Sequence, residues 1–195
     1  MLHSLFHRLL VPLAVSGALL ALSACSSAPK PKPAPPVAAP VQGTVREAQA
    51  VMRSASASLV SGKLTLSPVA GGVRIVGTIG GLAPSGRFGF HVHEVGDCSA
   101  VDASSAGGHF NPTHQPHGNA KIGAHHAGDM DNLTSDLEGV ARVDTRLGEV
   151  TLGGGAPSDL LGRALVIHAD PDDYATQPAG KSGARVACGV IQAIH

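Results

Sequence analysis

Residues 88–93 read Phe88-Gly89-Phe90-His91-Val92-His93, and this stretch bears on both the fold and the chemistry of the chain. Alternate residues of a β-strand point to the same face, so we expect His91 and His93 to lie side by side on one face. Imidazole is the commonest metal ligand in proteins. A His-x-His pair alone is a weak signal, because it also occurs in cupin-like metal sites and by chance.

The sequence around this stretch is rich in histidine. Seven of the eleven histidines lie between His91 and His126. An eighth, His168, ends an apolar run at residues 164–167. Ordinary surface chemistry does not explain such a cluster, which predicts a metal site.

The pattern of apolar residues predicts β-strands from about Ser58 onward. Leu64 and Leu66 alternate with polar residues, and an apolar alternation runs through 73–79. We expect further strands at 87–95, 139–145, 163–168 and 186–194. Residues 44–57 are ambiguous, and Glu47–Arg53 fits one or two helical turns. The segments 96–135 and 169–185 are polar and rich in Gly, and loops of this length are usually functional.

The composition favours an all-β domain without nucleic-acid partners. Lys plus Arg equals Asp plus Glu at 14 each, whereas nucleic-acid binding needs a basic excess. The chain has 195 residues, with 25 Gly, four Phe, one Tyr and no Trp. We therefore expect one domain with an aliphatic core and many turns.

The first residues are predicted to be a targeting segment. An apolar stretch from Leu9 to Leu22 is too short for a membrane span and leads into Leu22-Ser23-Ala24-Cys25. This tetrad resembles the bacterial lipobox, in which the signal peptide is cut before a cysteine that receives a lipid. The alternative is an ordinary secretory signal with an incidental cysteine. Either way residues 1–24 are a signal peptide that is removed.

The expected organisation is a lipidated Cys25, a Pro/Ala-rich linker to residue 43, and a domain at 44–195. If Cys25 carries lipid, Cys98 and Cys188 remain to form a disulfide, which an oxidising envelope preserves. The expected location is a bacterial cell envelope with a lipid bilayer as partner. Ser26 is not the aspartate of inner-membrane retention, which favours the outer membrane, facing the periplasm, in a diderm bacterium.

Four separated motifs resemble the copper/zinc superoxide dismutase family. The first is at 89–94 with 96–98, and the second is Gly107-Gly108-His109-Phe110-Asn111-Pro112. The third is His126-Ala127-Gly128-Asp129 with 132–133, and the fourth lies at 183–191. The resemblance covers roughly residues 58–194 and places Cys98 and Cys188 at the family's intrasubunit disulfide. It implies an eight-stranded antiparallel Greek-key barrel or sandwich with two long functional loops.

The resemblance also implies the cofactors copper and zinc and assigns their ligands. The implied copper ligands are His91, His93, His109 and His168, and the implied zinc ligands are His109, His117, His126 and Asp129. His109 would bridge both ions. His114 and His125 are substitutes for His117 and His126 that the sequence leaves open.

Two further residues receive roles from the resemblance. Asp172 is implied to link the copper ligand His91 to the zinc ligand His117, with a solvated acidic loop as the alternative. Arg185 is implied to be the active-site arginine that attracts the anion, with a surface arginine as the alternative. Lys181 and Lys121 are the other candidates for attracting the substrate.

The implied reaction is dismutation of superoxide to dioxygen and hydrogen peroxide, with copper exchanging electrons and His109 a proton. A copper or zinc buffer without turnover has the same ligand set, and a cupin-type enzyme would have one metal and no bridging histidine. No interface pattern separates a monomer from a homodimer.

Overall fold

The computed structural model describes residues 43–155 and 157–194. The predicted signal peptide, the lipidation site Cys25, the linker to residue 42 and His195 lie outside them. The described residues form nine strands and one short 3₁₀ helix, so the all-β prediction is confirmed. The elements are β1 Ala48–Ser54, β2 Ser61–Val69, β3 Gly72–Gly80, β4 Arg87–Phe88, β5 Phe90–His93, η1 Ser104–Ala106, β6 Leu133–Thr134, β7 Ala141–Gly148, β8 Ala164–His168 and β9 Arg185–Ala193.

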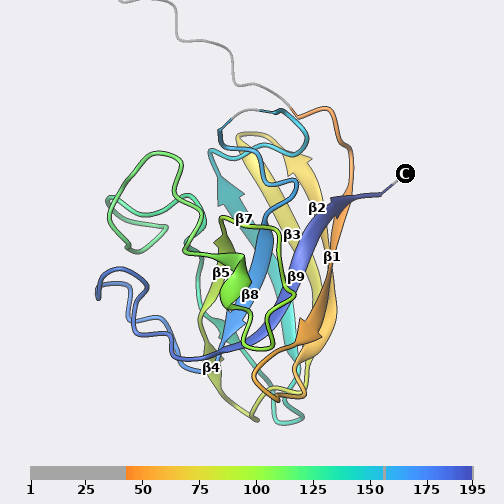
Figure 1. The fold of residues 1–195 in the computed structure, drawn as a ribbon, viewed down its shortest axis with the longest axis vertical. Helices are drawn as coiled ribbons and strands as arrows, with labels where there is room; N and C mark the ends of the chain where they lie inside the picture. The colour runs from red at the N-terminus through yellow and green to blue at the C-terminus, as the bar shows by residue number, and fades with distance from the viewer. Residues whose placement is uncertain (1–42, 156, 195) are drawn as a thin grey trace, which may run out of the picture. The chain divides into compact units, whose positions relative to one another are not determined.

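Seven strands form one curled antiparallel sheet in the order β5-β8-β9-β1-β2-β3-β7, and β4 pairs with β6 (Figure 1). β3 pairs with β7, and β5 with β8, although neither pair is consecutive in the chain. Such long-range antiparallel neighbours are the mark of Greek-key connections. The expected barrel or sandwich architecture is therefore confirmed.

The strand count differs from eight because Gly89 divides one strand into β4 and β5. Its N–H donates to Asp170 O at 2.9 Å, and its carbonyl accepts from His168 N at 2.8 Å. A Cβ at residue 89 would lie 2.9 Å from the Cβ of Ser182, so this close approach requires glycine. Counted as one interrupted strand, β4 and β5 give the eight strands expected.

The helical interpretation of Glu47–Arg53 is wrong. Ala48, Ala50 and Met52 are buried in alternation with more exposed neighbours, which is the period of a strand. Ala50 lies opposite Leu64 of β2 on one side and Ile191 of β9 on the other. The small alanines obscured the alternation in the sequence, and pairing with two distant strands decided the structure.

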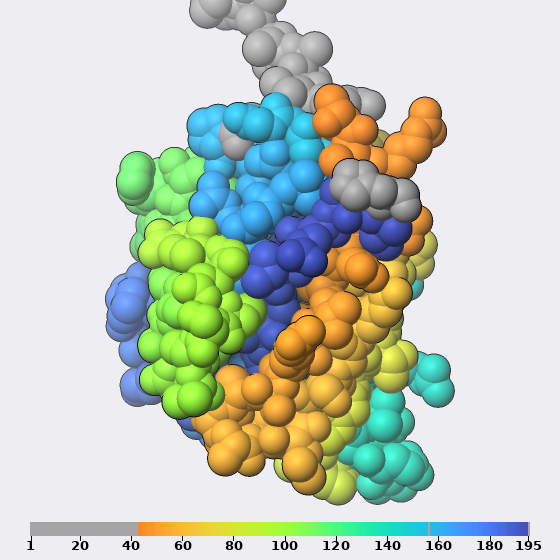
Figure 2. All heavy atoms as spheres, turned by 45° about the vertical axis from the view of Figure 1, so that its right-hand side comes forward, coloured from red at the N-terminus to blue at the C-terminus, as the bar shows by residue number. Residues whose placement is uncertain are grey.

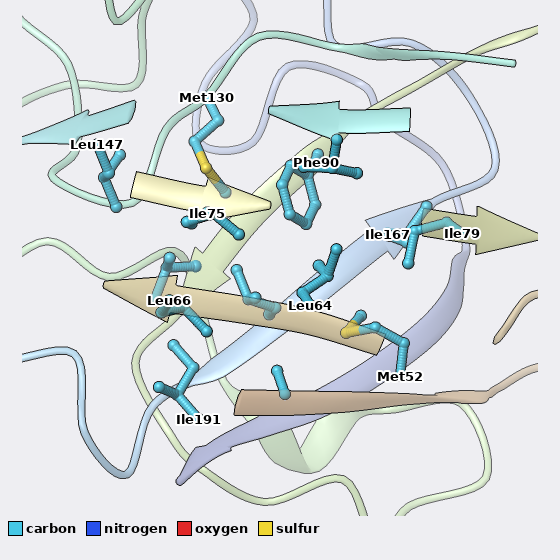
Figure 3. Close-up of a cluster of buried hydrophobic side chains, with 14 of the residues drawn as sticks. Met52, Leu64, Leu66, Ile75, Ile79, Phe90, Met130, Leu147, Ile167 and Ile191 are labelled. Atoms are coloured by element: carbon cyan, nitrogen blue, oxygen red, sulfur yellow. The ribbon is translucent and has the colours of Figure 1, made fainter. Parts of the chain in front are cut away.

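The core lies inside the curled sheet and consists mainly of aliphatic side chains (Figure 3). Leu64 and Leu66 of β2 are buried in the core with Ile75 and Ile79 of β3, as their parity predicted. Phe90 of β5 is the largest fully buried side chain. Since Phe90 and Val92 are in the core, burial of this strand fixes its histidines in place.

The two long segments predicted as functional loops leave the sheet beside β5 and β8. They run from residue 94 to 132 and from 169 to 184, and they form the green and blue loops at the left of Figure 1. In Figure 2 the light-green part of the first loop lies beside β9 and β1. No helix within the described ranges is long and apolar enough to cross a membrane.

Candidate metal centre

Four histidines from three parts of the fold converge beside β5. His91 and His93 come from β5, His168 ends β8, and His109 joins His93 through an isolated antiparallel bridge. One ring nitrogen from each lies within 4.8 Å of the others, and all four side chains are buried. This is the predicted copper set, built on paired strands that hold it rigidly.

A second cluster contains the predicted zinc ligands. Ligand atoms of His109, His117, His126 and Asp129 lie within 4.8 Å of one another, and all four residues are buried. Three imidazoles and one carboxylate are a donor set that zinc binds tetrahedrally. His109 belongs to both clusters, so the expected shared residue is present.

Each of the three copper-set histidines that lie on strands has one ring nitrogen held by a hydrogen bond. His91 Nε2 lies 2.8 Å from an oxygen of Asp172. His93 Nδ1 lies 2.9 Å from Gly107 O, and His168 Nδ1 lies 3.3 Å from the carbonyl of Gly183. These bonds fix the ring orientations. The opposite nitrogens, His91 Nδ1 and the Nε2 atoms of His93 and His168, are left for a metal.

The ring of His109 lies between the two clusters. Its Nδ1 is 2.8 Å from Asp129 Oδ1 on the zinc side. Its ring stacks on that of His91, with centroids 4.0 Å apart. One imidazole therefore offers one nitrogen to each cluster.

Unpartnered buried nitrogens show that the two sets fit metal ions. Within the described residues, the buried side-chain atoms without a hydrogen-bond partner include His91 Nδ1, His109 Nε2, His117 Nδ1 and His126 Nδ1. Buried polar atoms are normally satisfied, and each exception needs an explanation. All four belong to the two clusters, so coordination by metal accounts for them together.

Burial favours the neutral form of His93, His109 and His168, and neutral is the form that a metal ligand needs. Burial, with the neighbouring histidines, lowers the pKa of His93 to about 2 and that of His168 to about 3. Burial also lowers the pKa of His109 to about 4, although Asp129 opposes the shift. Neutral imidazole is the form that binds a metal.

Two residues of the zinc set, His117 and Asp129, have pKa values shifted toward their charged forms. Burial alone would lower the pKa of His117, but the nearby carboxylates of Asp129 and Asp172, 3.1 and 2.9 Å from its two ring nitrogens, raise it to about 9. Burial likewise opposes ionisation of Asp129, yet its contacts with the rings of His109, His117 and His126 hold its pKa well below the usual range. Zinc binding at His117 would release a proton from its ring, since a metal ligand must be deprotonated.

Asp172 lies between the two clusters, as the sequence predicted. Its Oδ2 lies 2.8 Å from His91 Nε2, and its Oδ1 lies 2.9 Å from His117 Nε2. Asp172 is 3 % exposed, so the alternative of a solvated acidic loop is wrong for this residue. The neighbouring carboxylates of Asp170 and Asp173 belong to neither ligand set.

Sequence reasoning missed the residues that hold Asp172. The side-chain amide of Asn132 bonds both backbone groups of Asp172, accepting at 2.7 Å and donating at 2.9 Å. The hydroxyl of Tyr174 accepts from Asn132 N and Nδ2, each at 2.9 Å. Tyr174 N also donates to Asp172 Oδ1 at 2.7 Å. The only available signals were an asparagine in the third motif and the chain's single tyrosine.

Gln177 is a second unforeseen residue and holds the backbone of His117. Its Oε1 accepts from His117 N at 2.8 Å, and its Nε2 donates to His117 O at 2.8 Å. The loop 169–184 therefore positions the zinc loop through both Asp172 and Gln177. Nothing in the local sequence distinguished this glutamine.

Arg185 begins β9 and reaches back to the first long loop. Its Nη1 donates to Ala103 O and its Nη2 to Gly107 O, both at 2.6 Å. Burial lowers its pKa from the ordinary value, and it is half-buried. Since Gly107 O is also the partner of His93, Arg185 lies next to the copper set. The alternative of a free surface arginine is therefore wrong.

The predicted disulfide joins Cys98 to Cys188, with Cα atoms 5.7 Å apart. It connects the first long loop to β9, three residues after Arg185. Ala103 and Ala106 of the loop pack against the same cluster as Cys188. The disulfide at Cys98 and the hydrogen bonds of Arg185 to Ala103 and Gly107 thus both tie the segment 98–107 to β9.

The remaining candidates lie outside the two clusters. His114 is exposed, and His125 Nδ1 bonds the carbonyl of His126 instead of facing the zinc set. The choice of His117 and His126 is therefore confirmed. Lys121 pairs with Asp131 at 2.7 Å, which reduces its attraction for an anion, whereas Lys181 is exposed.

Comparisons with known proteins agree with this geometry. A sequence model of the family described as Copper/zinc superoxide dismutase (SODC) matches residues 60–191. Superoxide dismutase [Cu-Zn] 2 of Aquifex aeolicus is 44% identical over 136 residues, which cover 68% of this chain and 80% of the relative. Superoxide dismutase [Cu-Zn] of Deinococcus radiodurans is 38% identical over 147 residues, 70% of this chain and 79% of the relative.

Solved structures share the fold. The crystal structure of the clock protein EA4 superposes with a TM-score of 0.69 at 38% identity, covering 77% of this chain and 96% of that one. A SOD-like protein from Bacillus subtilis gives a TM-score of 0.66 at 34% identity, covering 73% and 96%. The family match spans more than half of the chain and includes every copper and zinc ligand. The chain therefore belongs to the copper/zinc superoxide dismutase family.

Proposed function

We propose that this superoxide dismutase works as a lipid-anchored enzyme of a bacterial cell envelope. Its reaction converts superoxide to dioxygen and hydrogen peroxide at the copper site, which shares His109 with the zinc site. The shared ring is the observation that carries the function. A site of one metal does not need it, and a cupin-type reading is therefore wrong for this chain.

The chain supplies a proton site and two oriented ligand sets. When bound, copper exchanges single electrons with superoxide, and zinc adds positive charge to the shared ring. His109 Nε2 is buried without a protein partner and faces the copper set, so this atom gains and loses a proton in our proposal. Asp129, 2.8 Å from Nδ1, holds the ring in place while that exchange occurs.

Arg185 is proposed to hold the anionic substrate beside the copper set. Its guanidinium is fixed by two backbone carbonyls, Ala103 O and Gly107 O, and is half-buried. A fixed, partly desolvated cation attracts an anion more strongly than a solvated one. Lys181 is the additional candidate for attraction, since Lys121 is paired with Asp131.

A metal buffer is the remaining rival and is separated from an enzyme by turnover. A buffer needs neither Arg185 nor an accessible copper ligand set. Protein loaded with both metals should remove superoxide at a rate that collapses in His109→Ala. A slow rate equal to that of free copper, unchanged by His109→Ala, would support the buffer instead.

Anchoring at Cys25 is proposed from the lipobox-like sequence at 22–25. The disulfide between Cys98 and Cys188 supports an oxidising compartment. Labelled fatty acid should appear on the wild type and be absent from Cys25→Ser, whereas label on both would contradict the anchor. Ser26 favours the outer membrane, facing the periplasm, which fractionation of a diderm host would test.

The proposal is compatible with a monomer and with a homodimer. Every copper and zinc ligand comes from one chain, so the site is complete without a partner subunit. Sedimentation of the purified protein would distinguish the two states.

A further inference from the structure

The described residues have an uneven distribution of charge. They carry eleven Lys and Arg side chains and fourteen Asp and Glu side chains, a net charge of −3. Strands β1, β2, β3 and β7 hold five of the basic side chains and one acidic side chain, a net charge of +4. The rest of the described chain, including both metal loops, therefore carries −7.

These side chains lie on one outward surface, which we call the basic face. It comprises Arg53, Lys63, Arg74, Arg142, Asp144 and Arg146. All six are exposed, and they alternate with the inward residues of the core. Glu47, Glu138 and Glu149 lie just beyond the ends of β1 and β7 and border the face.

The strand register brings the basic residues together. Lys63 and Arg142 lie in one row, each opposite Thr78 of β3. Arg74 and Arg146 are direct cross-strand partners, although like charges in this position destabilise a sheet. Asp144 offsets part of this repulsion by binding Arg74 through two hydrogen bonds of 2.8 and 2.7 Å. The sheet thus accommodates a charge arrangement that its own stability does not favour.

A shallow, open depression of about 390 Å³ is bordered by both paired arginines. Its lining combines Arg74, Arg146, Asp144 and Thr145 with the apolar residues Val69 and Ala70. Arg146 Nη2 donates to the carbonyl of Ala70, which leaves its other donors available. Val69 is 37 % exposed. Cationic and apolar groups side by side suit a phospholipid headgroup, which is anionic with an apolar attachment.

We propose that the basic face docks on an anionic phospholipid bilayer and turns the metal loops away from it. Polybasic surfaces are attracted to anionic lipids, and each basic residue near the membrane raises the affinity about fivefold. Figure 1 places β1, β2 and β3 on the side opposite the loops around β5 and β8. The attraction is independent of the anchor proposed at Cys25, although an anchor would keep the face within reach of a bilayer.

The orientation also has a consequence for the substrate. Superoxide carries a negative charge, so a metal site pressed against an anionic bilayer would meet a repelled substrate. Docking through the basic face exposes the site to solution instead. The acidic remainder of the chain is repelled by the same bilayer, which reinforces one orientation.

The test uses vesicle binding by the chain from residue 25 with Cys25→Ser, so that neither leader nor lipid contributes. It should bind vesicles with 30 % phosphatidylglycerol at low salt, and vesicles of phosphatidylcholine alone at least tenfold more weakly. Lys63→Glu/Arg142→Glu should lower the partition coefficient at least tenfold, because neither side chain has an ion-pair partner among the described residues. Arg146→Gln should lower it about fivefold.

Arg46→Glu/Arg87→Glu is the matched control, since it changes the net charge equally at positions outside the four strands of the basic face. It should retain binding within about threefold of the parent chain. Equal losses in both double variants, no preference for the anionic vesicles, or retention on heparin without vesicle binding would each overturn the proposal. Thermal unfolding and the dismutation rate verify that each variant is folded. A failure of the fatty-acid label at Cys25 would leave this test unaffected.

Discussion

Arg185 and His93 donate to the same acceptor, the carbonyl oxygen of Gly107. Arg185 Nη2 lies 2.6 Å from it and His93 Nδ1 lies 2.9 Å from it. The proposed anchor for the anion and a copper ligand are therefore positioned by one peptide group. The disulfide at Cys98 fixes the same loop to β9. The position of the substrate site therefore depends on Arg185, on the Gly107 carbonyl and on the disulfide.

Arg185→Gln should lower kcat/KM by about tenfold at low ionic strength, because it removes the fixed cation beside the copper set. Metal content should not change, since Arg185 is not a ligand. Arg185→Lys keeps the charge but loses the paired bonds to Ala103 and Gly107, so its kcat/KM should lie between those of the wild type and Arg185→Gln. Pulse radiolysis with metal analysis measures both quantities. An unchanged rate in Arg185→Gln would contradict the role.

Asp172→Asn should weaken binding of zinc and copper by about 10–100-fold, because Asp172 orients both His91 and His117. Asp173→Asn is the matched control, since this neighbouring carboxylate bonds Thr176 and Ala175 instead. Competition with a chelator gives the two affinities. Equal losses in the two variants would show that general charge, not orientation, determines the affinity.

Tyr174→Phe should lower the free energy of unfolding by about 1–3 kcal/mol, because it removes the acceptor of Asn132 N and Nδ2. Zinc should also leave faster, since Asn132 holds the backbone of Asp172. Tyr174 is the only tyrosine, so its ultraviolet absorbance follows the unfolding of the wild type around this residue. If zinc dissociated at the wild-type rate, the contact would have no positioning role.

The metal-free protein should be most stable near pH 6.5. The pKa values of His93, His109 and His168 lie below the ordinary value, at about 2, 4 and 3. The unfolded chain therefore binds more protons below about pH 6.5, and stability falls as the pH falls. His117 has a pKa raised to about 9, so its contribution is lost as the pH rises from about 6.5 through 9.

Urea unfolding of the metal-free protein at several pH values measures this profile. The acid side should be steeper, because three histidines act there against one on the alkaline side. A stability that rose steadily from pH 5 to pH 9 would contradict the assignment. Bound metals should flatten the profile, since they replace the protons on these nitrogens.

Replacing both cysteines, Cys98→Ser/Cys188→Ser, should lower the free energy of unfolding by about 4–5 kcal/mol. The bond closes a loop with a sequence separation of 90 residues, which is long enough for a large effect on the unfolded chain. The dismutation rate should also fall, because the loop that positions Arg185 and His93 is released. Denaturant unfolding measures the first effect. Equal unfolding midpoints would contradict it.

The sequence predicted the ligands and the strands well because both depend on local patterns. Alternation gave the faces of β2, β3 and β5, the four motifs contained five of the ligands, and the family resemblance assigned the other two, His117 and His168. Glu47–Arg53 was misread because Ala48 and Ala50 are too small to mark a buried face, and only pairing with β2 and β9 makes the segment a strand. Long-range pairing of this kind leaves no local signal.

The supporting contacts of the site could not be predicted for a similar reason. Asn132 and Tyr174 are 42 positions apart, and His117 and Gln177 are 60 apart. Each pair meets only because two loops without regular structure fold against each other. Asp172 was found in advance through the family resemblance, whereas that resemblance gave no role to Asn132 or Tyr174, which hold it.

Anomalous diffraction at the copper and zinc edges from crystals of the metal-loaded protein tests the central claim most directly. We predict one copper beside His91, His93 and His168, and one zinc beside His117, His126 and Asp129, with the ring of His109 between them. A single ion for each chain, or two ions that do not share His109, would contradict the account.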